Sequence, residues 1–427
     1  MSIVEKVRET YRRIRERRDD GVWISLVPEE ISLARAAAVE GSDRPLAGLT
    51  VAIKDNIDLQ GLPTTAGCLA FAYEPAQDAA VVSKLLAAGA IPIGKTNLDQ
   101  FATGLNGTRS PYGIPRCVFN EDYISGGSSS GSAVAVAAGL VDFSLGTDTA
   151  GSGRVPAAFN NLIGYKPTRG RWSTAGLVPA CRTLDCITVF AKELPLARRV
   201  DEVIRGFDPA DPYSRPIPEV SPRQGAIGIL PEAEREFFGD TEYARLYSEA
   251  LAKAGALGWE VVEFDYRPFR EAAALLYAGP WVAERTAAME EFLAGHADAV
   301  HPTVRAIVEG GRKFTAVETF RAQYRLAALA RETEATWERC AALMLPTAGT
   351  IYTVEQMLAD PITLNSNLGR YTNFMNLLDL CGIAIPAGFR RDGIASGVTL
   401  FAPAWQDGHL FGLAEQWSGG LQSSDKQ

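Results

Sequence analysis

Short apolar runs that alternate with helical segments place the strongest constraint on the fold of this chain. LTVAIKD (49–55) is typical of a short buried strand, and AIPIGKT (90–96) is typical of a second one. Between them, DAAVVSKLLAAGA (78–90) has the apolar spacing of an amphipathic helix that ends at Gly89. A strand, a helix and a strand at this spacing predict a βαβ unit and a mostly parallel sheet.

The same alternation returns in the second half of the chain. Strand-like and helical segments alternate over 225–265 and again beyond residue 340, whereas 267–340 is predicted to be mostly helical. Because sheet segments lie on both sides of that helical block, we expect one α/β domain over 1–420 with a helical insertion. The polar tail at 421–427 is predicted to be disordered. Further helices are predicted at 3–18, 29–40, 133–141, 241–254, 366–381 and 407–417.

The composition is that of a cytosolic globular protein. The 427 residues are 47% hydrophobic, ample for a large core, and the net charge of −9 argues against a nucleic-acid partner. The six cysteines include no C-x-x-C pair, as expected of reduced thiols. The charged N-terminus does not have the apolar centre of a secretory signal, and no run approaches the roughly 18 apolar residues of a membrane span. We therefore expect a cytoplasmic protein without nucleic-acid or membrane partners.

Two loops rich in glycine and serine, GGSSSGS (126–132) and TDTAGSGR (147–154), need a chemical explanation. A phosphate-binding loop would need Lys and then Ser or Thr after Gly131, where the sequence has Ser and Ala. A nucleophile elbow, G-x-S-x-G, fits with Ser129 at its centre but also needs an acid and a histidine downstream. Only His409 has the right place in chain order for that histidine.

A third interpretation adds a lysine to the two loops. The chain has only three histidines, so a serine nucleophile would need another base. Lysine can serve if burial keeps it neutral, because burial lowers the pKa of an amine. Lys54 ends the predicted buried strand 49–55, which makes it the candidate. Taken alone, a salt-bridged lysine at a strand end would be the better explanation of Lys54.

Three long motifs resemble the amidase signature family. They are VAIKDNIDLQGLPTTAG (51–67), GGSSSGSAVAVAAGLV (126–141) and GTDTAGSGRVPAAFNNLIGYKPTRG (146–170). The resemblance covers 47–192 and continues more weakly to the end of the chain. It implies an α/β fold with a central mixed β-sheet, α-helices on both faces and a helical substrate-site segment at 267–340. It implies neither a cofactor nor a metal, and a homodimer that forms through helices in 1–45.

The resemblance also implies a triad of two serines and a lysine. Lys54 is the base, Ser128 follows a cis peptide bond, and Ser152 is the nucleophile that forms an acyl-enzyme. A proton would pass from Ser152 to Ser128 and from Ser128 to Lys54, and Ser128 would then protonate the leaving ammonia.

The oxyanion hole implied by the resemblance consists of the peptide N–H groups of Thr149, Ala150 and Gly151. Such a hole needs a tight turn with little side-chain bulk, which the sequence of the loop allows. We also expect Arg154 to hold the loop in place through Asp148.

Within the family, the chain looks most like the allophanate hydrolases. The segments are KTNLDQFATGLNGTRSPYG (95–113), TDTAGSGRVPAAFNN (147–161), VPACRTLDC (178–186) and YAGPWVAER (277–285). The last of these implies that Tyr277 and Arg285 hold the substrate carboxylate, since Arg offers a planar fork to a carboxylate. In the alternative, Arg285 pairs with Glu284 or Glu290 on a solvated helix and Tyr277 only packs.

The resemblance therefore implies an amidohydrolase that releases ammonia from allophanate, a small anionic amide. Allophanate hydrolases commonly have a further C-terminal domain that processes the product N-carboxycarbamate. This sequence ends after the amidase region, so ammonia release is the expected activity. Two alternatives stay open: a carboxybiuret hydrolase or similar amidase, and the amidase subunit of a tRNA-dependent amidotransferase. The pathway would be either urea use or the breakdown of cyanuric acid and biuret.

Replacing Lys54 by arginine tests the proposed base. Arginine keeps the positive charge but does not give up its proton, so Lys54→Arg should lose turnover roughly 10²–10⁴-fold. The measurement is amide hydrolysis at neutral pH, with folding checked by circular dichroism. Turnover like that of the wild type would remove Lys54 as the base.

Overall fold

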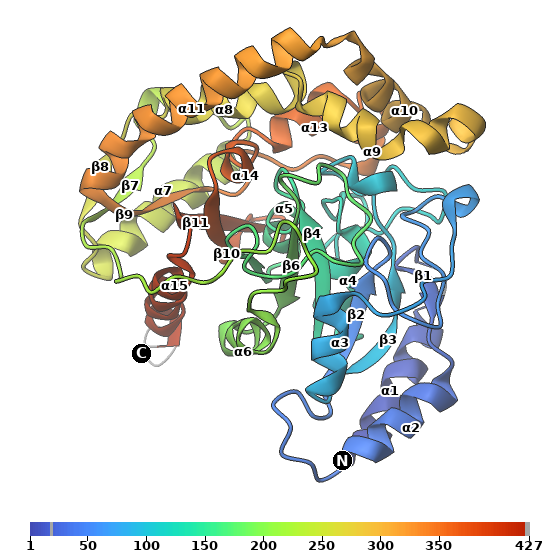
Figure 1. The fold of residues 1–427 in the computed structure, drawn as a ribbon. Coiled ribbons are helices and arrows are strands. Elements are labelled where there is room, and N and C mark those ends of the chain that lie inside the picture. Colours follow the sequence, from blue (N-terminus) through green and yellow to red (C-terminus); the bar gives the residue numbers. More distant parts are fainter. Residues whose placement is uncertain (18–19, 423–427) are drawn as a thin grey trace.

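An eleven-stranded sheet forms the centre of the described part of the chain (Figure 1). The computed structural model describes residues 1–17 and 20–422. The strands lie in the order β1-β3-β2-β4-β6-β5-β10-β11-β9-β7-β8. Their bounds are β1 (Trp23–Leu26), β2 (Thr50–Lys54), β3 (Ile91–Thr96), β4 (Phe143–Asp148), β5 (Ile163–Lys166), β6 (Cys186–Ala191), β7 (Ala226–Ile229), β8 (Val261–Glu263), β9 (Cys340–Pro346), β10 (Leu380–Phe389) and β11 (Ala395–Pro403).

Helices flank this sheet along the whole chain. The described α-helices are α1 (Ile3–Glu16), α2 (Glu29–Val39), α3 (Ala80–Ala87), α4 (Ser130–Ala137), α5 (Val155–Phe159), α6 (Leu194–Ile204), α7 (Thr241–Ala256), α8 (Arg267–Ala278), α9 (Trp281–His296), α10 (Pro302–Glu309), α11 (Ala316–Arg339), α12 (Val354–Ala359), α13 (Thr363–Leu368), α14 (Phe374–Leu377) and α15 (Asp407–Gln422).

The sheet combines parallel and antiparallel strands. Among the described residues, four of the ten neighbouring pairs are parallel: β2 with β3 and β4, and β7 with β8 and β9. The other pairs, including β4-β6, β6-β5 and β10-β11, are antiparallel. The mixed sheet is thus confirmed, whereas the prediction of a mostly parallel sheet is wrong. An apolar run indicates that a strand is buried but carries no information on its direction.

The predicted βαβ unit is confirmed as β2-α3-β3, and it shows why the sheet needs cover on both faces. Side chains alternate along a strand, so Val51 and Ile53 of β2 point into one hydrophobic cluster and Ala52 points into another. α3 and α6 contribute to the first cluster, and α1, α2 and α4 contribute to the second. Every residue of β2 is buried as a result.

Residues 267–340 are mostly helical, as predicted, in α8, α9, α10 and α11. Figure 1 shows these four helices, yellow to orange, together at the end of the molecule away from α1 and α2. The single helix predicted over 366–381 is wrong: α13 ends at Leu368, α14 is separate and short, and β10 already begins at Leu380. Asp379 has a positive φ of 54°, so the chain turns there and cannot continue as a helix.

Both ends of the chain give further comparisons with the predictions. α1 packs inward, with Val7, Tyr11 and Ile14 buried in the chain's own core. α15 extends to Gln422, two residues into the tail predicted to be disordered, and the rest of that tail lies outside the described residues.

The periodicity did not predict β1, β5 or β6. No helix in the described residues is long and apolar enough to cross a membrane.

A buried carboxylate next to the sheet gives a stability prediction. Asp201 on α6 accepts hydrogen bonds from Arg171 Nε (2.9 Å) and Trp172 Nε1 (2.9 Å), and its side chain is only 3% exposed. Asp201→Asn leaves the buried guanidinium of Arg171 with only the more distant carboxylate of Asp407, at 4.0 Å, as a counter-ion. We expect the free energy of unfolding in urea to fall by about 3–5 kcal/mol.

The matched control is Asp379→Asn. Asp379 pairs with Arg169 and Arg215 in a more exposed setting, with 28% of its side chain accessible. Solvent screens such pairs, so this variant should lose about 1 kcal/mol or less. Equal losses in the two variants would contradict the importance of the buried pair.

Candidate active site

Lys54 lies at the end of β2 and has no exposed surface. Its ammonium nitrogen donates to Ser128 Oγ at 2.8 Å and to Thr147 Oγ1 of β4 at 2.7 Å. Because β2 is flanked by β3 and β4, its last side chain is enclosed by the loops that follow those strands. The structure therefore brings together Lys54 and Ser128, which are 74 residues apart in the sequence.

Two opposing effects act on the charge of Lys54. Burial disfavours the ammonium form and lowers the pKa of Lys54 to about 7, while Asp99, Asp185 and Asp148 raise it. At neutral pH a large fraction of the amine is therefore uncharged. A neutral amine at 2.8 Å from a serine hydroxyl can accept its proton.

Ser128 lies just before α4, after a cis Gly127–Ser128 peptide bond, in accord with the resemblance. Its carbonyl accepts the N–H of Asp99 at 3.1 Å. A β-carbon on Gly127 would come within 2.4 Å of Asp99 Oδ2, so only glycine fits at this position. Ser129, the centre of the alternative nucleophile elbow, instead donates to the Thr147 carbonyl at 3.1 Å and so holds the backbone of β4.

The second loop is organised by Asp148 at the end of β4. Asp148 accepts the N–H of Gly151 at 2.8 Å and that of Gly153 at 3.1 Å. Arg154 donates to both oxygens of the same carboxylate, at 2.8 and 3.0 Å, and the pair is completely buried. The expected link between Arg154 and Asp148 is confirmed. Gly151 has a φ of +134°, which favours glycine in this turn.

Ser152, the third residue of the predicted triad, bonds neither Lys54 nor Ser128 in the described structure. Its hydroxyl donates to the carbonyl of Gly104 at 3.3 Å. In the part of the chain that the structure describes, no hydrogen bond joins Ser152 to Ser128. The lysine and the first serine are thus in direct contact, whereas the hydroxyl of the second serine is bonded to the backbone of Gly104.

The peptide N–H groups predicted for the oxyanion hole differ in availability. That of Gly151 already donates to Asp148. Those of Thr149 and Ala150 have no acceptor among the described residues. The two N–H groups that remain free belong to the turn that immediately precedes Ser152.

Tyr277 on α8 and Arg285 on α9 lie side by side at the site. Arg285 is 2% exposed and donates to Thr103 Oγ1 at 3.0 Å and to the Tyr277 hydroxyl at 3.4 Å. Thr103 directly precedes Gly104, so these side chains lie near the loop that accepts the Ser152 hydroxyl. Glu284 and Glu290 bond other partners, and the alternative in which either glutamate pairs with Arg285 is wrong.

Arg109 is a neighbour that the sequence analysis did not single out. It is buried, donates to the carbonyl of Thr103 at 2.9 Å, and lines a cavity of about 230 Å³ together with Tyr277. The Nε atoms of Arg109 and Arg285 are both buried without a hydrogen-bond partner in the described structure. A single arginine in a loop is not part of any periodic pattern, so only the charge of Arg109 could have indicated its place at the site.

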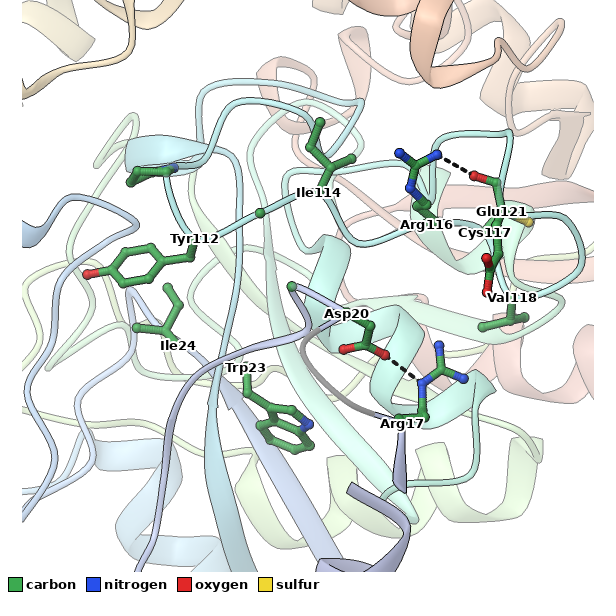
Figure 2. A pocket seen from close by; sticks show the side chains of 13 residues that line it. Arg17, Asp20, Trp23, Ile24, Tyr112, Ile114, Arg116, Cys117, Val118 and Glu121 are labelled. Atoms are coloured by element: carbon green, nitrogen blue, oxygen red, sulfur yellow. Dashed lines mark hydrogen bonds and ion pairs between the residues drawn. The ribbon is translucent and has the colours of Figure 1, made fainter. Parts of the chain in front are cut away.

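One further cavity is lined by other residues than this cluster. A cavity of about 950 Å³ is lined by the end of α1, by β1 and by residues 111–121, and includes Trp23 and Arg116 (Figure 2). None of the triad candidates lines that cavity. Among the described residues, no group of three or more His, Cys, Asp or Glu side chains is placed to hold a metal ion.

The fold and this cluster define a class of protein: an α/β enzyme of the amidase type, with a buried lysine between two serine-rich loops. The sequence profile of the family described as Amidase matches residues 5–411. The chain belongs to the amidase family.

Relatives of known name support this assignment. The chain is 44% identical to urea amidolyase of Saccharomyces cerevisiae over 407 residues, 93% of this chain and 22% of that protein. It is 34% identical to a glutamyl-tRNA(Gln) amidotransferase chain of a Synechococcus strain, over 90% of this chain and 85% of that one. The structure of Kluyveromyces lactis allophanate hydrolase matches with a TM-score of 0.93 and 42% identity, over 98% of this chain and 70% of that one. The chain thus spans about a fifth of the length of urea amidolyase.

A serine-directed fluorophosphonate probe tests the choice of nucleophile. Ser152→Ala should abolish covalent labelling, because the probe needs an activated serine hydroxyl. Ser129→Ala is the control and should keep the label, since Ser129 bonds the backbone of β4. The measurement is peptide mapping of the labelled protein by mass spectrometry. A label found at Ser128 or Ser129 in the Ser152→Ala variant would mean that the nucleophile is another serine.

Proposed function

We propose that this chain hydrolyses the terminal amide of allophanate and releases ammonia through an acyl-enzyme on Ser152. One observation carries the proposal: a buried Arg285 and Tyr277 pair contacts the same loop that accepts the Ser152 hydroxyl. A guanidinium recognises a carboxylate, and the nucleophile attacks an amide, so the pair of sites suits a small amide with a carboxylate at its other end. Similarity to urea amidolyase and allophanate hydrolase supports this substrate.

In the proposed reaction, Ser152 Oγ attacks the terminal amide carbonyl while its proton passes to Ser128. Ser128 gives its own proton to the neutral amine of Lys54, to which it is already hydrogen-bonded. The proton then returns through Ser128 to the amide nitrogen, the C–N bond breaks, and ammonia leaves. Water attacks the remaining ester carbonyl, and N-carboxycarbamate is released as Ser152 regains its proton.

The buried arginines near the site favour an anionic substrate, although the net charge of the chain does not. The chain has a net charge of −9, so bulk electrostatics would repel an anion. Arg109 and Arg285 are both buried, and neither forms an ion pair with a carboxylate in the described structure. A buried cation without a close counter-ion is costly, and a bound carboxylate would lower that cost.

Two other functions have support of their own. A carboxybiuret hydrolase would use the same carboxylate site, and a structural neighbour at 27% identity belongs to a protein complex linked to the origins of an s-triazine catabolic enzyme. The amidase subunit of a tRNA-dependent amidotransferase is supported by the 34% identity to the glutamyl-tRNA(Gln) amidotransferase chain. The physiological pathway follows from the substrate: urea use for allophanate, or cyanuric acid and biuret breakdown.

A cytoplasmic location and a homodimer belong to the same proposal. The six cysteines are buried and unpaired, as suits a reducing compartment. α1 and α2 lie together at one end of the molecule, and this end would form the contact with a second copy (Figure 1).

An ammonia-release assay with allophanate, biuret, glutamine and malonamate tests the substrate, and Arg285→Gln tests the site. We expect allophanate to be the best substrate. Arg285→Gln should raise KM roughly 10- to 100-fold for allophanate and malonamate, because a hydrogen bond to a charged group is lost, but hardly for uncharged malonamide.

Arg312→Gln is the matched control for Arg285→Gln. Arg312 pairs with Glu290 on the surface, and neither residue contacts the site. Its KM values should equal those of the wild type. Equal effects of Arg285→Gln on charged and uncharged amides would remove its carboxylate role, and a preference for glutamine would favour the amidotransferase alternative.

A further inference from the structure

Three buried carboxylates surround Lys54, and two of them have clear structural partners. Asp148 is paired with Arg154. Asp99 accepts the backbone N–H groups of Gly107 and Arg109, both at 3.0 Å, and so shapes the 104–109 loop. Asp185, the third, has no ion pair among the described residues, although it is only 7% exposed. A buried carboxylate without a paired cation calls for another explanation.

One hydrogen-bond partner of Asp185 lies in the turn formed by Thr149, Ala150 and Gly151, which we call the oxyanion turn. Its Oδ2 atom accepts the N–H of Ala180 at 2.8 Å, and both its oxygens accept the N–H of Cys181. These bonds fix the carboxylate in its own loop. Its Oδ1 atom also accepts the hydroxyl of Thr149, 36 residues earlier in the chain. Thr149 is the first residue of the turn whose free N–H groups precede Ser152.

We infer that Asp185 is a positioning residue for the oxyanion turn: it holds the Thr149 hydroxyl and thereby directs the N–H groups of Thr149 and Ala150. This inference rests on the proposed amide hydrolysis at Ser152. The preceding residue, Asp148, is fixed by β4 and by Arg154, so one end of the turn is already held. The bond to Asp185 adds a second fixed point at the next residue, Thr149, where the turn begins.

The charge of Asp185 should also affect the pH dependence of activity, which a purely structural role would not change. Asp185 is among the groups that raise the pKa of Lys54, together with Asp99 and Asp148. Burial raises the pKa of Asp185 itself to about 6, while its hydrogen bonds and Arg285 lower it. The thiols of Cys181 and Cys186 on the same segment stay neutral because burial raises the pKa of each.

The sign of the pH effect follows from these groups. Activity needs neutral Lys54, so it rises with pH through the pKa of Lys54, near 7. A protonated Asp185 accepts fewer hydrogen bonds, so activity should fall again as pH drops through about 6. The wild-type kcat/KM should therefore fall more steeply in acid than a single protonation allows. Asp185→Asn removes one protonation and also lowers the pKa of Lys54, so its acid limb should be shallower and displaced to lower pH.

Thr149 provides the variants that separate positioning from folding. Thr149→Val keeps the shape but removes the hydroxyl, and kcat should fall roughly 10- to 100-fold with KM almost unchanged. Thr149→Ser restores the hydroxyl and should recover most of the activity. Asp211→Asn is the matched control, because Asp211 holds Thr174 in the same manner outside the site. Thermal unfolding of each variant shows whether it is folded.

The rate of fluorophosphonate labelling at Ser152 makes the test independent of the substrate, since the phosphonyl oxygen uses the same N–H groups. Slower labelling of Thr149→Val and Asp185→Asn, with normal labelling of Thr149→Ser and Asp211→Asn, would support the inference even if allophanate were not hydrolysed. A failure to hydrolyse allophanate would overturn only the proposed substrate. Wild-type labelling and kcat in Thr149→Val, or an unchanged acid limb in Asp185→Asn, would overturn the role of Asp185.

Discussion

The contact on which the rest of this site depends is the hydrogen bond between Lys54 and Ser128, two residues with no exposed surface. An amine in water would stay protonated far above neutral pH, and its value as a base would be lost. The sheet removes that water: β2 lies between two parallel neighbours and helices cover both faces. The large core is therefore part of the proposed chemistry, because burial in it lowers the pKa of Lys54.

The glycines of the two loops serve the close approach of backbone to side chain. At Gly127 the neighbouring carboxylate of Asp99 occupies the space of any β-carbon, and Gly151 adopts a φ that other residues avoid. Both positions let a carboxylate bind backbone N–H groups directly. Asp148 and Asp99 each organise a loop in this way, so fixed charges help to hold both loops.

The sequence allowed predictions within single segments of the chain. Motifs identified Lys54, Ser128 and Ser152, and periodicity predicted the βαβ unit and the helical 267–340 segment. It could not predict which carbonyl holds Ser152, because Gly104 lies 48 residues away. The contact between Thr103 and Arg285 spans 182 residues, and nothing in either local pattern indicates it. Strand direction and the break between α13 and α14 were missed for a similar reason: both depend on tertiary packing and on single turn residues.

The balance at Lys54 also gives a reason for three carboxylates near the proposed base of an acidic protein. Burial alone would push the pKa of the lysine far down, and a very weak base would hardly draw a proton from serine. The three negative charges act in the opposite direction and leave the pKa near 7, where a general base is most effective at neutral pH. Each carboxylate has a second task in holding a loop, so the groups that shape the site also raise the pKa of Lys54. A change in any of the three should therefore alter geometry and proton transfer together.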